Sequence, residues 1–135
     1  MTDGQKDLVR YRIERALETW QEARLMLESG HLHGAANRIY YACFYATVAL
    51  LLTRNLSRPK HSGVMVLFNR HFIKEGAVPV EMGKFYSRVF DHRLESDYGE
   101  IMERDKDEIR TDLEKAEEFI AHIRSLLGSR GDGSL

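Results

Sequence analysis

The feature that most constrains the fold is an apolar run over residues 39–52, in which Thr47 is the one interruption. A helix that is apolar on every side must be surrounded by other elements of the same protein. The run has 14 residues, whereas a helix that crosses a bilayer needs about 20. We therefore predict a buried core helix over about residues 32–54, and no association with a membrane.

Four other segments carry helical patterns. Apolar residues recur every three or four positions over about residues 6–28 and 98–127, with charged residues between them. Ser57 and Pro59 are typical of a helix start and Gly76 of a helix end, and Pro79 opens another apolar stripe. We predict an all-α fold, an antiparallel bundle of four to five helices. It forms one domain over residues 1–127, with a flexible tail at residues 128–135.

Composition excludes several classes of protein. The single cysteine, Cys43, rules out an intrachain disulfide and a multi-cysteine zinc site, and its apolar neighbours predict a buried, inert thiol. His31 and His33 have no obvious third ligand, so we expect no metal site and no cofactor. The first residues lack the apolar core of a signal peptide, which favours a cytoplasmic protein.

The charges are divided along the chain, although the formal net charge is only −1. No acidic residue lies between Glu28 and Glu75, whereas residues 75–135 have a net charge of −6. We call the interval between Glu28 and Glu75 the basic segment. It contains six positive residues: Arg38, Arg54, Arg58, Lys60, Arg70 and Lys74.

The basic segment has two interpretations. In the first, its charges pair with the acidic helices, within the bundle or between protomers. In the second, its last five positive residues converge with His61 where the second and third helices meet, and form an edge that binds phosphate or RNA. Both interpretations are open at the level of sequence.

Polar residues inside apolar surroundings suggest a further site. Arg38 stands where the core helix becomes apolar, and burying a guanidinium without a carboxylate or phosphate partner is costly. Arg93 and Asp97 are four residues apart and share a helix face, as in an ordinary surface ion pair. The alternative is a polar network that joins Arg38, Arg93 and Asp97 to one of the clustered tyrosines, Tyr40, Tyr41 or Tyr45.

Familiar catalytic motifs, such as the P-loop and the H-E-x-x-H zinc motif, are missing, but three segments together carry a family resemblance. Residues 38–46 follow the pattern R-x-Y-Y-A-x-F-x-A. Residues 60–76 contain K-H-x-x-V, then F, then F-I-K-x-G, and residues 93–99 contain R-x-x-x-D-Y-G. The set resembles HEPN domains (higher eukaryotes and prokaryotes nucleotide-binding), in particular the short, single-domain branch of bacteria and archaea.

The resemblance implies a helical bundle that is commonly a homodimer and is often encoded beside a minimal nucleotidyltransferase, as a toxin–antitoxin pair. Many members are metal-independent ribonucleases with an R-x(4–6)-H motif. The arginine steadies the phosphate, and the histidine takes part in proton transfer as the RNA 2′-hydroxyl attacks. Guanidinium and imidazole suit these two tasks, because one binds phosphate bidentately and the other titrates near neutral pH.

The sequence departs from that motif. After Arg93, the positions where the histidine would fall are held by Tyr98, Gly99 and Glu100. Arg54 and His61 have the right spacing but lie outside the motif's place in the family. Catalytic residues are therefore not assigned, and the candidates are His61, Arg93 and Asp97.

The leading hypothesis is a HEPN-type module that binds RNA or nucleotide phosphates and works as a homodimer with a nucleotidyltransferase partner, which could attach a nucleotide to Tyr98. One alternative is a metal-independent endoribonuclease that uses His61 with Arg54, Arg58 or Arg93. The other is a purely structural helical adaptor. The candidate phosphate-binding residues are Arg38, Arg54, Arg58, Lys60 and Arg93, and the candidate polar network is Arg38, Tyr41, Arg93, Asp97 and Tyr98.

Overall fold

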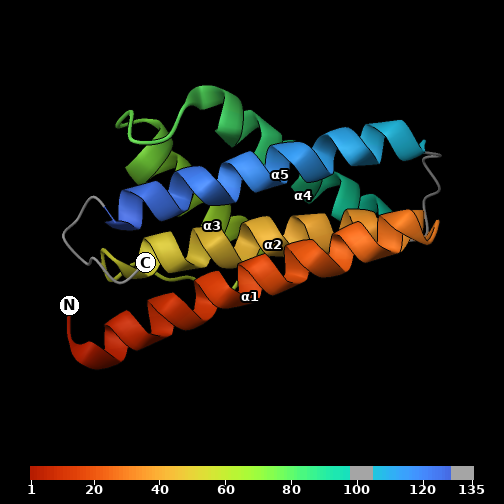
Figure 1. The fold of residues 1–135 in the computed structure, drawn as a ribbon. Helices are drawn as coiled ribbons and strands as arrows, with labels where there is room; N and C mark the ends of the chain where they lie inside the picture. The colour runs from red at the N-terminus through yellow and green to blue at the C-terminus, as the bar shows by residue number, and fades with distance from the viewer. Residues whose placement is uncertain (98–104, 129–135) are drawn as a thin grey trace.

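The computed structural model describes residues 1–97 and 105–128, except for the side chains of residues 94–97, and every regular element in these ranges is helical (Figure 1). The predicted all-α bundle is thus confirmed. In chain order the elements are α1 (Asp3–Glu28), α2 (Leu32–Leu52), α3 (His61–Phe68), the π-helical turn η1 (Asn69–Ile73), α4 (Val80–Asp97) and α5 (Lys106–Leu127).

Local chemistry sets the helix ends. Thr2 and Gln5 form a capping box at the start of α1, in which the Gln5 backbone N–H donates to Thr2 Oγ1 at 3.1 Å and the Thr2 N–H donates to Gln5 Oε1 at 2.8 Å. After α1, Gly30 adopts a φ of 80°, a left-handed conformation that suits glycine. Asp105 caps α5 by accepting from the Glu108 N–H at 2.8 Å.

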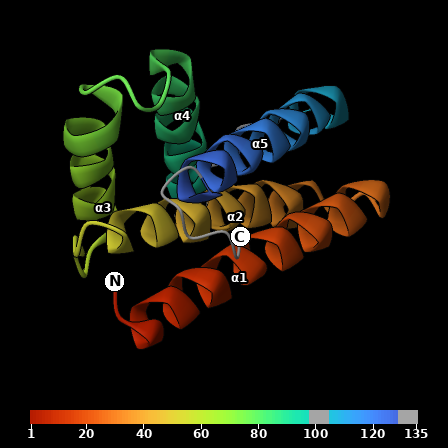
Figure 2. The same cartoon turned by 60° about the vertical axis from the view of Figure 1, so that its left-hand side comes forward.

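Helix α2 is the centre of the bundle. α1 makes the most extensive contact with it, and α5, α4 and α3 cover other parts of its surface (Figure 2). Ala35, Ala42, Ala46 and Ala49 are fully buried, and these small side chains let the neighbouring helices approach closely. By length and composition alone α2 could also cross a membrane, but most of it is buried inside the bundle, as in the core helix of a soluble protein.

Two polar contacts fix α5 against its neighbours. The Trp20 indole N–H on α1 donates to the Leu113 carbonyl on α5 at 2.8 Å. The Arg88 guanidinium on α4 pairs with the Asp112 carboxylate at 2.7 Å, and the Asp112 side chain is almost fully buried. A buried carboxylate requires such a partner, so this pair holds α4 and α5 in register.

Some predicted boundaries differ from the structure or lie outside it. The third segment is predicted as one helix closed by Gly76, but it consists of α3 followed by the π-helical turn η1. The last helix is predicted from about residue 98, whereas α5 begins at Lys106 and residues 98–104 lie outside the described ranges. Residues 129–135 of the predicted tail also lie outside the described ranges, so the flexible tail stays a prediction. The division into one domain over residues 1–127 likewise stays a prediction.

Arg54 ties the end of α2 to η1. Its NH1 group donates to the His71 carbonyl and to Glu75 Oε2, each at 2.8 Å, and its guanidinium lies 4.2 Å from the centre of the Phe72 ring. The hydrogen bond from Arg54 is the main cause that lowers the pKa of the exposed Glu75 carboxyl. Arg54 therefore has three partners within the fold.

We expect the Arg54→Ala variant to lower the free energy of unfolding by about 1–2 kcal/mol, since it removes a cation–π contact and a hydrogen bond to a carbonyl. Arg70→Ala is the matched control, because Arg70 is exposed on η1. Urea unfolding followed by circular dichroism measures both variants. An equal effect of the two substitutions would contradict the role given to Arg54.

Candidate functional site

The candidate site is centred on Tyr40, a fully buried residue of α2. Its hydroxyl lies 3.0 Å from Nδ1 of His61, the first residue of α3, and the two rings are stacked with their centres 5.8 Å apart. His61 also stacks on Phe44 of α2 at 4.2 Å. The histidine is thus held between the start of α3 and one face of α2.

Arg93 reaches the same tyrosine from α4. Its guanidinium carbon lies 5.3 Å from the centre of the Tyr40 ring and 5.8 Å from that of Tyr41, which is cation–π distance. Arg93 and His61 therefore contact one side chain, although 32 positions separate them in the sequence.

Arg38 completes the group from the first half of α2. Its guanidinium carbon lies 5.0 Å from the centre of the Tyr41 ring, and its Nε and NH2 groups donate to Asn37 Oδ1 at 3.2 and 2.9 Å. Its NH1 group is 3.7 Å from Glu22 Oε1 on α1, a loose ion pair at the surface. We call Arg38, Tyr40, Tyr41, Phe44, His61 and Arg93 the arginine–tyrosine cluster.

Burial controls the protonation of Tyr40 in this cluster and of Tyr86 beside it. Loss of solvation raises the pKa of Tyr40, and the positive charge of Arg93 partly opposes the rise. Burial likewise raises the pKa of Tyr86 on α4, whose ring stacks on that of Tyr40 with centres 6.1 Å apart. Both hydroxyls are therefore neutral at neutral pH.

The cluster brings together some of the residues expected from sequence. Arg38 and Arg93 of the predicted polar network both contact the ring of Tyr41, and Arg93 and His61 of the catalytic candidates both contact Tyr40. Asp97 is the last residue of α4, but its side chain lies outside the description, as does Tyr98.

Other candidates have different surroundings. About 14 residues of α2 separate Arg38 from the end of the helix at Leu52, roughly 21 Å along its axis. Arg54 lies beyond that end and donates to the His71 carbonyl of η1. Arg58 and Lys60 are exposed just before α3, beside His61 in sequence. We therefore leave Arg54 out of the candidate site and keep Arg58 and Lys60 at its edge.

Sequence reasoning did not identify Tyr40 as the contact between His61 and Arg93, nor Glu22 as the neighbour of Arg38. A usable signal for Tyr40 was its place beside Tyr41 at the start of the apolar run, where a hydroxyl needs a partner. No signal of this kind marks Glu22, because its contact depends on how α1 lies against α2.

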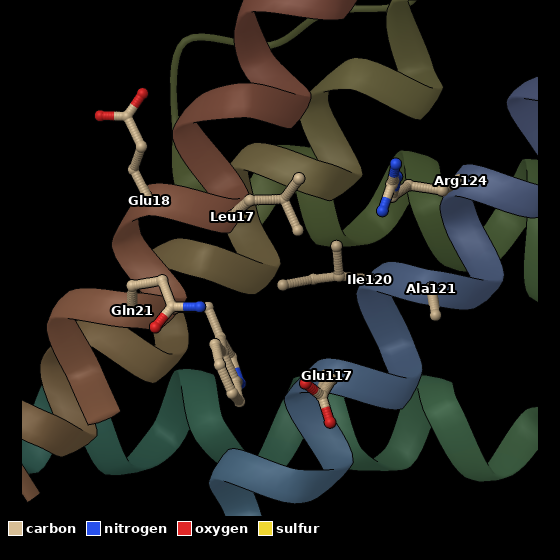
Figure 3. A pocket seen from close by; sticks show the side chains of 8 residues that line it. Leu17, Glu18, Gln21, Glu117, Ile120, Ala121 and Arg124 are labelled. Carbon is tan, nitrogen blue, oxygen red and sulfur yellow. The ribbon is translucent and has the colours of Figure 1, made fainter. Parts of the chain in front are cut away.

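Two other features lie outside the cluster. Among the residues that the structure describes, no group of three His, Cys, Asp or Glu side chains could hold a metal ion. A groove of about 430 Å³ lies between α1 and α5 (Figure 3). It is lined by Leu17, Glu18, Trp20, Gln21, Glu117, Ile120, Ala121 and Arg124, and so shares no residue with the arginine–tyrosine cluster.

The family follows from comparison with known proteins. The sequence model of the HEPN domain matches residues 9–126, a span that contains the whole arginine–tyrosine cluster. The chain belongs to the HEPN domain family. This membership confirms the resemblance seen in residues 38–46, 60–76 and 93–99.

Individual relatives cover most of this HEPN domain. A "UPF0332 protein" of Thermotoga maritima is 47% identical over 120 residues, which are 89% of this chain and 91% of the relative. Two proteins of Methanocaldococcus jannaschii are each 32% identical. "Putative toxin MJ0142" matches 87% of this chain and 80% of its own length, and "Putative toxin MJ0605" matches 85% of both.

The buried tyrosines predict a distinctive alkaline titration. A raised pKa means that the folded state holds the proton more tightly than the unfolded state does. This contribution to stability is therefore complete below about pH 10 and is lost as the pH rises further. We expect ultraviolet titration to show tyrosines that ionise only as circular dichroism reports unfolding.

Tyr40→Phe should remove one of these late-ionising groups, and Tyr11→Phe, at an exposed position on α1, should remove none. Ionisation of all six tyrosines in a fully folded protein would contradict the burial argument.

Proposed function

We propose that this HEPN domain is a toxin-like module that binds RNA or nucleotide phosphates at the arginine–tyrosine cluster. The observation that carries the proposal is that the guanidinium groups of Arg38 and Arg93, from different helices, both lie within 6 Å of the centre of one ring, Tyr41. Two positive groups thus converge on a half-buried aromatic side chain.

This arrangement suits a single-stranded nucleic acid. A guanidinium binds a phosphate through two parallel hydrogen bonds, and an aromatic or guanidinium plane can stack on a base. Proteins that bind single strands combine such stacking surfaces with positive charges that follow the backbone. Arg58 and Lys60, exposed beside the start of α3, supply charges of this kind at the edge of the site.

The proposal includes a partner and a cellular role. Two relatives carry the name "Putative toxin", which supports a toxin role for this chain as well. We propose that it acts as a homodimer in the cytoplasm, paired with a minimal nucleotidyltransferase that modifies Tyr98. The opposite charges of the basic segment and of residues 75–135 would favour association between protomers.

We expect Arg93→Ala to raise the Kd for a single-stranded RNA oligonucleotide by roughly tenfold or more, because a hydrogen bond to a charged group contributes about 1.5–3 kcal/mol. Lys60→Ala should have a smaller effect and reduce the salt dependence of log Kd by about one unit of slope. Fluorescence anisotropy at several salt concentrations measures both effects.

The matched control is Arg110→Ala, which removes a surface arginine of α5 that pairs only with Asp107 among the described residues. An equal loss of affinity in this variant would show that binding reflects overall charge. Absence of salt-dependent binding by the parent protein would instead favour the adaptor hypothesis, in which the cluster is internal bracing.

A second candidate function is a metal-independent endoribonuclease, and it is favoured by the contact of both His61 and Arg93 with Tyr40. Arg93 would hold the phosphate while His61 takes the proton of the 2′-hydroxyl. The 2′-oxygen then bonds to phosphorus and the P–O5′ bond breaks. The leaving O5′ takes a proton from the imidazolium, so that a 2′,3′-cyclic phosphate and a 5′-hydroxyl result.

For this second function we expect RNA cleavage that persists in EDTA and falls at least a hundredfold in His61→Ala, which removes the general base. His33→Ala is the control, because His33 is exposed near the start of α2. The products are followed by gel electrophoresis of an end-labelled oligonucleotide. If pure parent protein at high concentration cleaves no RNA, the endoribonuclease is ruled out while the binding function still stands.

A further inference from the structure

The arginine–tyrosine cluster has a continuation one helical turn further along α2. Tyr45 stands four positions after Tyr41, so the two side chains lie on the same face of the helix, with their ring centres 6.0 Å apart. The guanidinium carbon of Arg15, on α1, lies 5.6 Å from the centre of the Tyr45 ring. The contact of Arg38 with Tyr41, at 5.0 Å, is thus repeated by Arg15 with Tyr45.

The repeat follows from the antiparallel packing of α1 against α2 (Figure 1). Three pairs of neighbouring residues mark the seam between the two helices: Glu22 with Arg38, Arg15 with Tyr45, and Gln5 with Asn55. Positions on α1 therefore advance along α2 from the cluster toward the end of the helix. Arg15 lies one step along this seam from Arg38.

Two carboxylates of α1 pair with these arginines. Glu18 Oε2 is 3.2 Å from NH1 of Arg15, and Glu22 Oε1 is 3.7 Å from NH1 of Arg38. The Glu18 and Glu22 side chains are 63% and 45% exposed, and exposed ion pairs of this kind contribute little to stability. A phosphate that accepts two parallel hydrogen bonds from a guanidinium binds more strongly, so it can displace either carboxylate.

We propose that Arg15 and Tyr45 form a second phosphate subsite, which continues the arginine–tyrosine cluster along the seam between α1 and α2. The ligand is then a segment of single-stranded RNA, with one phosphate at the cluster and the next at Arg15. The inference rests on the binding function proposed above. The Tyr45 ring holds the guanidinium in place by a cation–π contact, and the N–H groups at the guanidinium edge donate to the phosphate.

The geometry favours an extended strand over a free nucleotide. The distance between the rings of Tyr41 and Tyr45 is close to the helical pitch of about 5.4 Å, and one nucleotide of an extended strand spans a comparable length. The phosphate of a nucleoside monophosphate can occupy only one subsite at a time. The tyrosine rings are half-buried, and their accessible parts can stack on unpaired bases, whereas the bases of a duplex are already stacked on one another.

The test is a series of ligands of increasing length, measured with the whole protein by competition fluorescence anisotropy. The ligands are uridine monophosphate and oligouridylates that grow by one nucleotide at a time. For the parent protein we expect the largest fall in Kd between the monophosphate and the shortest oligonucleotide with two phosphates, because the second phosphate reaches Arg15.

Arg15→Ala should remove this gain. We expect its Kd for the longer oligonucleotides to rise roughly tenfold, and the slope of log Kd against log salt concentration to fall by about 0.7. Its Kd for uridine monophosphate should equal that of the parent. Arg93→Ala, by contrast, should weaken the binding of both kinds of ligand, because Arg93 belongs to the cluster.

Two further variants separate binding from bracing of the fold. Arg10→Ala is the matched control, because Arg10 also pairs with a carboxylate three positions away, Asp7 at 3.3 Å, but lies on another side of α1 from Arg15. It should leave every Kd unchanged. Glu18→Gln removes the competing negative charge beside Arg15, so it should tighten the binding of the longer oligonucleotides by up to about fivefold.

The outcomes distinguish the second subsite from the proposed function. If Arg93→Ala weakens binding but Arg15→Ala binds the longer oligonucleotides as the parent does, the subsite is rejected and the binding function stands. An equal loss in Arg10→Ala also rejects the subsite. Absence of binding by the parent overturns the proposed function, and the subsite with it. If circular dichroism shows that Arg15→Ala does not fold, Glu18→Gln decides, and an unchanged or weaker affinity in that variant overturns the proposal.

Discussion

The burial of α2 on every side is the constraint on which the rest of the structure depends. A fully buried Leu or Phe side chain contributes about 1.5–3 kcal/mol, and α2 can bury so many apolar groups only when α1, α3, α4 and α5 all pack around it. Its alanines let these neighbours come close enough to exclude water. The other helices need to bury one face each, which is why they are amphipathic.

The same burial explains why the polar groups of α2 are concentrated and paired. Tyr40, Cys43 and Thr47 follow one another at intervals of three and four residues, so they share a helix face. Every polar atom on that face must find a partner inside the protein. The hydroxyl of Tyr40 finds it in His61 at the start of α3, and the ring faces of Tyr40 and Tyr41 accept the guanidinium of Arg93 from α4. The candidate site is thus the place where the core helix meets the surface through its polar residues.

The charges of the basic segment are used in more than one way. Arg54 is bound by Glu75 and by the Phe72 ring, so for this residue the structure follows the interpretation of internal pairing. Among the described carboxylates Arg38 meets only Glu22, in a loose ion pair, and Arg58 and Lys60 are exposed. The near-zero net charge is therefore a sum over residues with different roles. Arg54 stabilises contacts within the fold, whereas Arg38, Arg58 and Lys60 lie in or beside the candidate site.

The sequence by itself determined the helical class, the central position of residues 39–52 and the family, because burial patterns and short motifs are local properties of the chain. It also indicated Arg38, Tyr41, His61 and Arg93 as residues of interest. Only the tertiary structure decided which of them meet. His61 contacts Tyr40 because the segment after α2 folds back along it, and Arg54 faces Glu75 because η1 ends beside the end of α2. Such contacts depend on the angles between packed helices and on loop paths. No spacing within a single helix encodes these angles and paths. The sequence pattern therefore names candidate residues, and the packing of the helices around α2 decides which of them come into contact.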